Sequence, residues 1–170
     1  MIVKVSIEKI FTSVPLVLLY VLCFTELNLE SVFYLQFFSF NVNAMLVYFW
    51  TLKRPQMLGS GHIFFANLIN DVVLGLPLGT SPLTYLALAL VATYIKNSTI
   101  HQRFSTDWFA FIPAIFFAYG INFIMIIKFS DLTISYNDIV RNSFFTFLFF
   151  PFFYYLFKTY SEKLGLDTDA

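Results

Sequence analysis

Six apolar segments divide this 170-residue chain, and they constrain its fold more than any other feature. A bilayer core about 30 Å thick requires about 20 apolar residues per helix, which the longer segments reach. Charged residues make up only 12% of the chain, against about 25% in a soluble domain, so the surface suits lipid rather than water. We therefore expect an all-α integral membrane protein, a single bundle of about six transmembrane helices at about residues 10–27, 32–52, 61–76, 82–95, 108–127 and 139–157.

Prolines mark several of the expected helix boundaries. Pro55 ends the second segment, because the residue before a proline disfavours helical geometry. Pro82 follows a serine that can cap a helix, and proline is favoured at the first helical position. Pro151 lies inside the sixth segment, where it removes a backbone hydrogen bond and predicts a kink. We treat 1–170 as a single membrane domain that ends in a short charged tail, 158–170.

Basic residues predict the orientation in the membrane, because Lys and Arg concentrate in cytoplasmic loops. With the N-terminus inside, eight of the ten basic residues fall in cytoplasmic segments, and only Lys128 and Arg141 fall outside. Both termini are therefore expected in the cytoplasm. Lys4 and Lys9 before the first apolar segment resemble the start of a signal peptide, but no small-residue cleavage site follows. We expect this segment to be retained as the first helix.

Several classes of function find no support in the sequence. The formal net charge is zero, whereas a nucleic-acid-binding protein has a basic excess. Cys23 is the only cysteine, so an internal disulfide cannot form. The sequence contains no nucleophile elbow, His-Glu-x-x-His pair, P-loop or dinucleotide-binding glycine motif. His62 and His101 have no second ligand at metal-binding spacing. We expect no enzyme, no cofactor and no metal site.

The third segment contains the main departure from the apolar pattern. Asp71 is the only acidic residue well inside an expected span, and such a residue costs about 2.5–3.5 kcal/mol on insertion scales. Asn67, Asn70 and Asp71 fall within one helical arc of about 100°. One interpretation is a buried polar seam that fixes helix packing or binds a partner, with Asp71 protonated. The other is a proton or ion site. We favour the seam, because no further ionisable groups lie at similar depth.

A glycine–proline run follows Asp71 directly. Gly75 and Gly79 have the small-xxx-small spacing of membrane helix dimers. Pro77 stands between them, however, and favours a tight turn in which the glycines adopt unusual backbone angles. Three other polar residues in apolar stretches are each expected to hydrogen-bond between helices: Asn41, Asn43 and Asn122.

The stretch from Tyr48 to Tyr85 resembles the rod-shape-determining protein family MreD. That family has an Asp-apolar-apolar-x-Gly-x-x-x-Gly run at the end of its third helix, which Asp71, Gly75 and Gly79 match. A leucine-rich helix and a tyrosine follow, as they do here. Pro151 in the last segment is a further similarity. This chain departs from the family by a polar residue just before the aspartate and by many phenylalanines in place of leucines.

The resemblance implies a non-catalytic subunit of the bacterial cell-elongation machinery. Such a protein is a multi-pass component of the cytoplasmic (inner) membrane and has the lipid bilayer as its surroundings. It lies beside MreC, and the two link MreB filaments to the peptidoglycan synthases, RodA and its transpeptidase partner. The expected outcome of this scaffold is lateral wall growth and rod shape. The resemblance implies no catalytic residue.

The MreD fold is similar to that of the substrate-binding S-components of energy-coupling-factor vitamin transporters, which are therefore the alternative. S-components usually have an Ala-x-x-x-Ala motif on their first helix, where the transporter docks. The corresponding stretch here, Phe11 to Tyr20, contains no alanine. This difference disfavours the transporter interpretation. A membrane scaffold with another role is a third interpretation.

Overall fold

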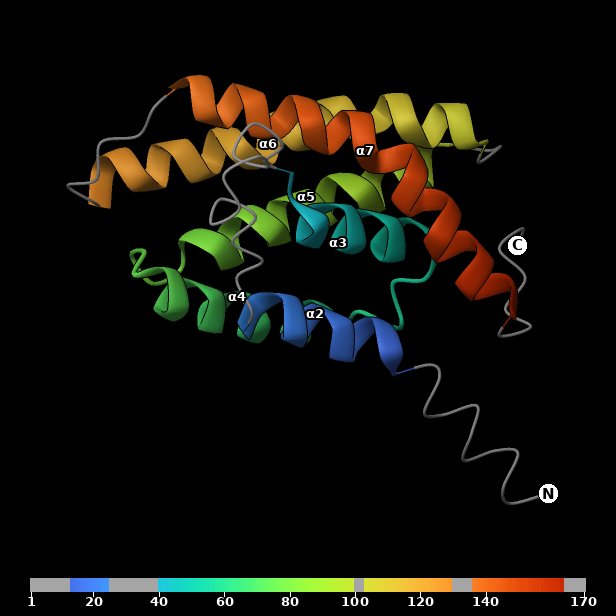
Figure 1. The fold of residues 1–170 in the computed structure, drawn as a ribbon, viewed down its shortest axis with the longest axis horizontal. Coiled ribbons are helices and arrows are strands. Elements are labelled where there is room, and N and C mark those ends of the chain that lie inside the picture. Colours follow the sequence, from blue (N-terminus) through green and yellow to red (C-terminus); the bar gives the residue numbers. More distant parts are fainter. Residues whose placement is uncertain (1–12, 25–39, 100–102, 130–135, 164–170) are drawn as a thin grey trace, which may run out of the picture.

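The computed structural model describes residues 13–24, 40–99, 103–129 and 136–163, apart from the side chains of residues 136 and 138 (Figure 1). These described residues form six α-helices and no strand, so the all-α prediction is confirmed. The helices are α2 (Val14–Phe24), α3 (Val42–Lys53), α4 (Ser60–Leu74), α5 (Thr80–Ser98), α6 (Phe104–Phe129) and α7 (Tyr136–Lys163).

Each described helix lies on one of the six apolar segments, but several boundaries differ. α6 and α7 extend beyond the expected 108–127 and 139–157 at both ends, because polar residues at helix ends remain helical outside an apolar core. α3 begins at Val42, well after the expected residue 32. The side chain of Asn41 accepts a hydrogen bond from the backbone N–H of Ala44 and so caps α3 there. The rest of the first two expected segments lies outside the described residues.

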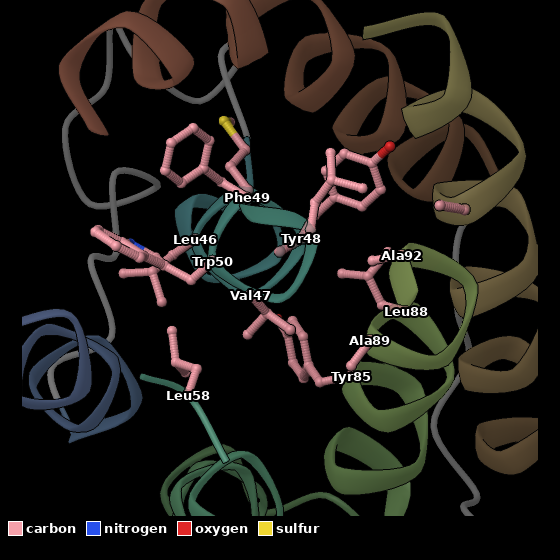
Figure 2. Packing of buried hydrophobic residues seen from close by; sticks show 14 of the residues in the cluster. Leu46, Val47, Tyr48, Phe49, Trp50, Leu58, Tyr85, Leu88, Ala89 and Ala92 are labelled. Atoms are coloured by element: carbon pink, nitrogen blue, oxygen red, sulfur yellow. The ribbon is translucent and has the colours of Figure 1, made fainter. Parts of the chain in front are cut away.

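α3 forms the centre of the molecule. Every residue from 43 to 52 is buried, as expected of a helix that packs on all sides. Figure 2 shows the side chains of Val47, Tyr48, Phe49 and Trp50 leaving α3 in different directions. α2, α5 and α7 surround it, and its aromatic rings contact those of α6 and α7. The hydrophobic core is therefore built around a single short helix.

α5 connects the two sides of this core. It packs against α3, α4 and α6, and Ala89 and Ala92 are buried and face α3 (Figure 2). Small side chains allow two helix backbones to approach closely. In Figure 1, α2 and α4 lie on one side of α3 and α5, and α6 and α7 lie on the other.

α6 and α7 are the longest described helices and lie on the outside of the bundle. They are the two described helices that are long and apolar enough to cross a membrane. Only 28% of the apolar window of α6 and 17% of that of α7 are buried, whereas the core helix of a soluble protein would be mostly buried. Pro113 lies inside α6 and Pro151 inside α7. Figure 1 shows α7 changing direction between its orange and red parts.

Candidate functional site

The end of α4 is fixed by its backbone geometry. Gly75 has φ 65° and ψ 26°, the left-handed conformation that closes many helices. The N–H of Leu76 donates to the carbonyl of Asp71 (2.9 Å), and that of Gly75 donates to the carbonyl of Val72 (3.4 Å). These are the two hydrogen bonds of a Schellman motif. Gly79, just before α5, also has a positive φ of 100°. The turn predicted around Gly75, Pro77 and Gly79 therefore requires both glycines.

Asp71 holds the start of the next helix. Its side chain is wholly buried, and both carboxylate oxygens accept hydrogen bonds from the backbone. Oδ2 accepts from the N–H of Gly79 (2.7 Å), and Oδ1 accepts from the N–H of Ser81 (2.9 Å). The first N–H groups of a helix have no partner within it, and glycine has no side chain with which to cap them. A residue of α4 therefore caps α5.

The charge of Asp71 suits this position. The N-terminus of a helix carries a partial positive charge, which stabilises a nearby carboxylate. Asn70 adds a hydrogen bond from its amide to the hydroxyl of Ser81 (3.3 Å). The hydroxyl of Thr80 donates to the carbonyl of Pro77 (2.7 Å) across the same turn. The α4–α5 connection is thus a compact polar junction in which each named group has an intramolecular partner.

Asn67, one turn earlier on α4, belongs to a different cluster. Its side-chain oxygen accepts a hydrogen bond from the amide of Asn43 on α3 (3.1 Å) and a weak one from the thiol of Cys23 on α2 (3.8 Å). Its own amide donates to the carbonyl of Ile63 (2.8 Å). The three polar residues predicted to share one face therefore bind different helices. Asn67 joins α2, α3 and α4, whereas Asn70 and Asp71 hold α5.

Three further asparagines, Asn41, Asn43 and Asn122, make the interhelical hydrogen bonds that the sequence predicts. Besides capping α3, Asn41 donates from its side-chain amide to the hydroxyl of Tyr85 on α5 (2.7 Å). Asn43 donates to Asn67, as described above, and Asn122 on α6 donates to the hydroxyl of Thr84 on α5 (3.3 Å).

A buried ion pair joins α3 to α6, and sequence reasoning missed it. The Lys53 ammonium lies 3.0 Å from Oδ2 of Asp107, and the two side chains are only 5% and 1% exposed. The Tyr154 hydroxyl of α7 donates to the same carboxylate oxygen (3.3 Å). The Tyr48 hydroxyl donates to the backbone carbonyl of Asp107 (3.0 Å). This ionic junction ties together α3, α6 and α7.

From the sequence, we expected Lys53 and Asp107 to lie outside the helices. Lys53 was expected just after the second helix and Asp107 just before the fifth, yet the structure includes them in α3 and α6. Both were expected at the cytoplasmic side, so their opposite charges are the signal that could have suggested a pair. Their burial could not be predicted from the sequence, because Tyr154, which contacts both side chains, belongs to α7, far along the chain.

The sequence predicts no metal-binding partner for either histidine. His62 is exposed, and its ring nitrogen lies 3.4 Å from the hydroxyl of Tyr20. His101 lies outside the described residues. Within the parts of the chain that the structure describes, no group of three His, Cys, Asp or Glu side chains could hold a metal ion.

Comparisons with protein-family models, curated proteins and solved structures find no match to this chain. The structural class of the protein is therefore inferred from the described fold alone. The described residues define an all-helical protein with two candidate membrane-spanning helices. Polar side chains join its helices at the α4–α5 junction, at the ionic junction and around Asn67.

Proposed function

We propose that this protein is a non-catalytic scaffold subunit of the bacterial cell-elongation machinery. It lies in the cytoplasmic membrane as a six-helix bundle with both termini in the cytoplasm. The observation that carries the proposal is the capping of α5 by Asp71 through the backbone of Gly79 and Ser81. This contact lies within the run that resembles the MreD family, and it gives that run's aspartate a structural role.

The same contact disfavours transport of protons or ions by Asp71. A transporting carboxylate must exchange its partner during each cycle, and it needs a path to water. The Asp71 side chain is 0% exposed, and both of its oxygens are engaged by backbone N–H groups. The two glycines of the run, Gly75 and Gly79, each adopt a positive φ that the turn requires. The positions of Asp71, Gly75 and Gly79 are thus consistent with a role in folding and do not call for a role in proton or ion transport.

The outer faces of α6 and α7 support placement in the membrane. Large apolar side chains point away from the core, among them Phe116 (71% exposed) and Phe152 (65% exposed). Such surfaces are favourable in lipid and unfavourable in water. α3 is only 12 residues long, which corresponds to about 18 Å. A helix of this length is tolerated inside a bundle where other helices cover it.

As a scaffold, the protein would hold MreC, MreB filaments and the synthases RodA and its transpeptidase partner in one complex. The resemblance over residues 48–85 supports these partners. Helix association in lipid depends on close packing and interhelical hydrogen bonds rather than on the hydrophobic effect. The exposed apolar side chains of α6 and α7 offer surfaces for such contacts.

The proposal is tested by depletion and by pull-down. Depletion in a rod-shaped host should give round, swelling cells, and a mild-detergent pull-down should recover MreC. Asp71→Leu should reproduce the depletion phenotype, because it removes the cap of α5. Val72→Leu is the matched control, since Val72 is adjacent and 67% exposed. Normal cell shape together with recovery of transporter ATPases would instead identify a vitamin-transporter S-component.

A further inference from the structure

Pro151 interrupts the hydrogen bonding of α7, the helix that changes direction in Figure 1. A proline has no backbone N–H, so the carbonyl of Phe147, four residues earlier, loses the donor that it would have in a regular helix. The indole N–H of Trp108 on α6 donates to this carbonyl instead (3.2 Å). The Trp108 ring also stacks on the Phe147 ring, with 5.2 Å between the centroids. α6 thus supplies the hydrogen bond that the proline removes from α7.

The residue next to Trp108 holds the other side of the proline. The carboxylate of Asp107 accepts a hydrogen bond from the hydroxyl of Tyr154, three residues after Pro151 (3.3 Å). Two consecutive residues of α6 therefore hold α7 before and after its proline. Because a proline weakens the backbone hydrogen bonding that keeps a helix straight, the angle between the two parts of α7 depends on these side-chain contacts.

The part of α7 after the proline, residues 152–163, forms an arm that packs on α3. Its buried side chains recur at helical spacing, at Tyr154, Phe157 and Ser161, and each is at most 5% exposed. The rings of Tyr154 and Phe157 lie 5.2 Å and 5.4 Å from the ring of Phe49 on α3, measured between centroids. The arm is therefore held to the core by one face.

The arm also covers the ionic junction. The Tyr154 ring lies 6.0 Å from the Lys53 ammonium, and the Tyr154 hydroxyl donates to Asp107. The side chains of this ion pair are 5% and 1% exposed. The position of the arm therefore decides whether the two charges stay buried.

We propose that residues 152–163 are an arm hinged at Pro151, which closes over the ionic junction. The hydrogen bond from Trp108 to Phe147 is the latch that keeps the arm closed. Loss of the latch leaves a carbonyl without its donor for as long as α7 stays kinked, which destabilises the closed position. In the open position the arm leaves α3 and exposes the ion pair to solvent. None of these contacts depends on the proposed scaffold function.

The opening of the arm is measured by alkylation of single cysteines with N-ethylmaleimide, in the full chain in mild detergent. Ser161→Cys places a thiol on the buried side of the arm (1% exposed). Thr146→Cys places a thiol on the buried side of α7 before the hinge (0% exposed). Both are made together with Cys23→Ala, which removes the only native cysteine. Both thiols should react slowly while Trp108 is present.

Trp108→Phe keeps an aromatic ring and removes the indole N–H. It should raise the alkylation rate at position 161 by at least about fivefold, which corresponds to the loss of one hydrogen bond, and leave the rate at position 146 unchanged. Trp50→Phe is the matched control, because the indole N–H of Trp50 is buried and has no hydrogen-bond partner among the described residues. It should leave both rates unchanged.

Pro151→Ala tests the hinge itself. Alanine restores an N–H that can donate to the carbonyl of Phe147, so α7 should straighten and the arm should leave α3. The rate at position 161 should therefore rise. Adding Trp108→Phe should raise it no further, because the carbonyl then has a donor within its own helix.

Four results would overturn the proposal. The first is an unchanged rate at position 161 in either Trp108→Phe or Pro151→Ala. The second is an equal increase at position 146, which would show loosening of the whole protein. The third is an equal increase in Trp50→Phe, which would show that ring volume rather than the hydrogen bond matters. The fourth is a multiplication of the two effects in the double variant, which would show that latch and hinge are independent.

Discussion

The carboxylate of Asp71, on α4, accepts a 2.9 Å hydrogen bond from the backbone N–H of Ser81, in the first turn of α5. The other carboxylate oxygen accepts from Gly79 (2.7 Å). Both contacts are made by donors, so the side chain acts only as an acceptor. This requirement distinguishes a carboxylate from a carboxamide of nearly the same shape.

Asp71→Asn should therefore destabilise the protein, although a neutral hydrogen bonder at this position would have tolerated the change. The amide keeps one acceptor oxygen and turns its NH₂ group toward an N–H donor. Leaving a buried donor unpaired costs about 1–3 kcal/mol. Thermal unfolding in detergent measures the loss. Ser81→Ala is the control, because it keeps the backbone N–H and removes only the hydrogen bond to Asn70. Wild-type stability of Asp71→Asn would show that the start of α5 does not need both hydrogen bonds to this side chain.

The buried pair of Lys53 and Asp107 predicts strong coupling. Lys53→Met leaves an unpaired carboxylate that is 1% exposed, and breaking a buried pair in this way costs about 3–5 kcal/mol. Lys53→Met with Asp107→Leu should recover most of that loss, because no charge then remains buried. A double-mutant cycle on the unfolding free energy measures the coupling.

The exposed pair of Lys158 and Glu162 provides the comparison for that cycle. Its atoms are 3.7 Å apart, and its side chains are 40% and 55% exposed. Lys158→Met should change the stability by about 1 kcal/mol or less, since exposed pairs contribute little. Equal effects of Lys53→Met and Lys158→Met would contradict the burial of the ionic junction.

Replacing a glycine that has a positive φ should destabilise the protein locally. Gly79→Ala should destabilise by about 1–2 kcal/mol, because a Cβ disfavours left-handed geometry. Open space around the added Cβ means that the cost comes from the backbone rather than from a clash. Gly61→Ala is the control, since Gly61 lies within α4 without a positive φ. It should be neutral or stabilising by up to about 1 kcal/mol. Similar unfolding temperatures for the two variants would argue against the turn.

Topology is tested with reporter fusions. Fusions after Lys53 and Lys163 should report the cytoplasm, and fusions after Thr80 and Phe129 should report the outside. The expectation follows from the bias of basic residues toward the expected cytoplasmic segments. Reversal of two of these four positions would rule out the six-helix arrangement, even if α6 and α7 still cross the membrane.

The sequence predicted the helices better than their contacts. Apolar runs and prolines locate both ends of α4 and α5 within three residues and those of α6 and α7 within six, because these signals are local. The start of α3 at Val42 was not predicted, because an asparagine such as Asn41 in an apolar run is compatible with a helix interior and with a helix cap. The role of Asp71 as the cap of α5 could not be predicted from the sequence either. Its donors belong to the next helix, and only the turn through Gly75 and Gly79 brings them close.

The complete enclosure of α3 has a consequence for the order of assembly. α3 is synthesised early, yet its side chains are covered partly by α7, the last described helix, through contacts such as Phe49 with Tyr154 (5.2 Å between ring centroids). Until α7 emerges from the ribosome, the side chains of α3 that α7 later covers have no contact with it and must be covered in another way. The core therefore closes only after α7 has been synthesised. Truncations within α7 should leave a chain with an uncovered α3, which quality-control proteases recognise.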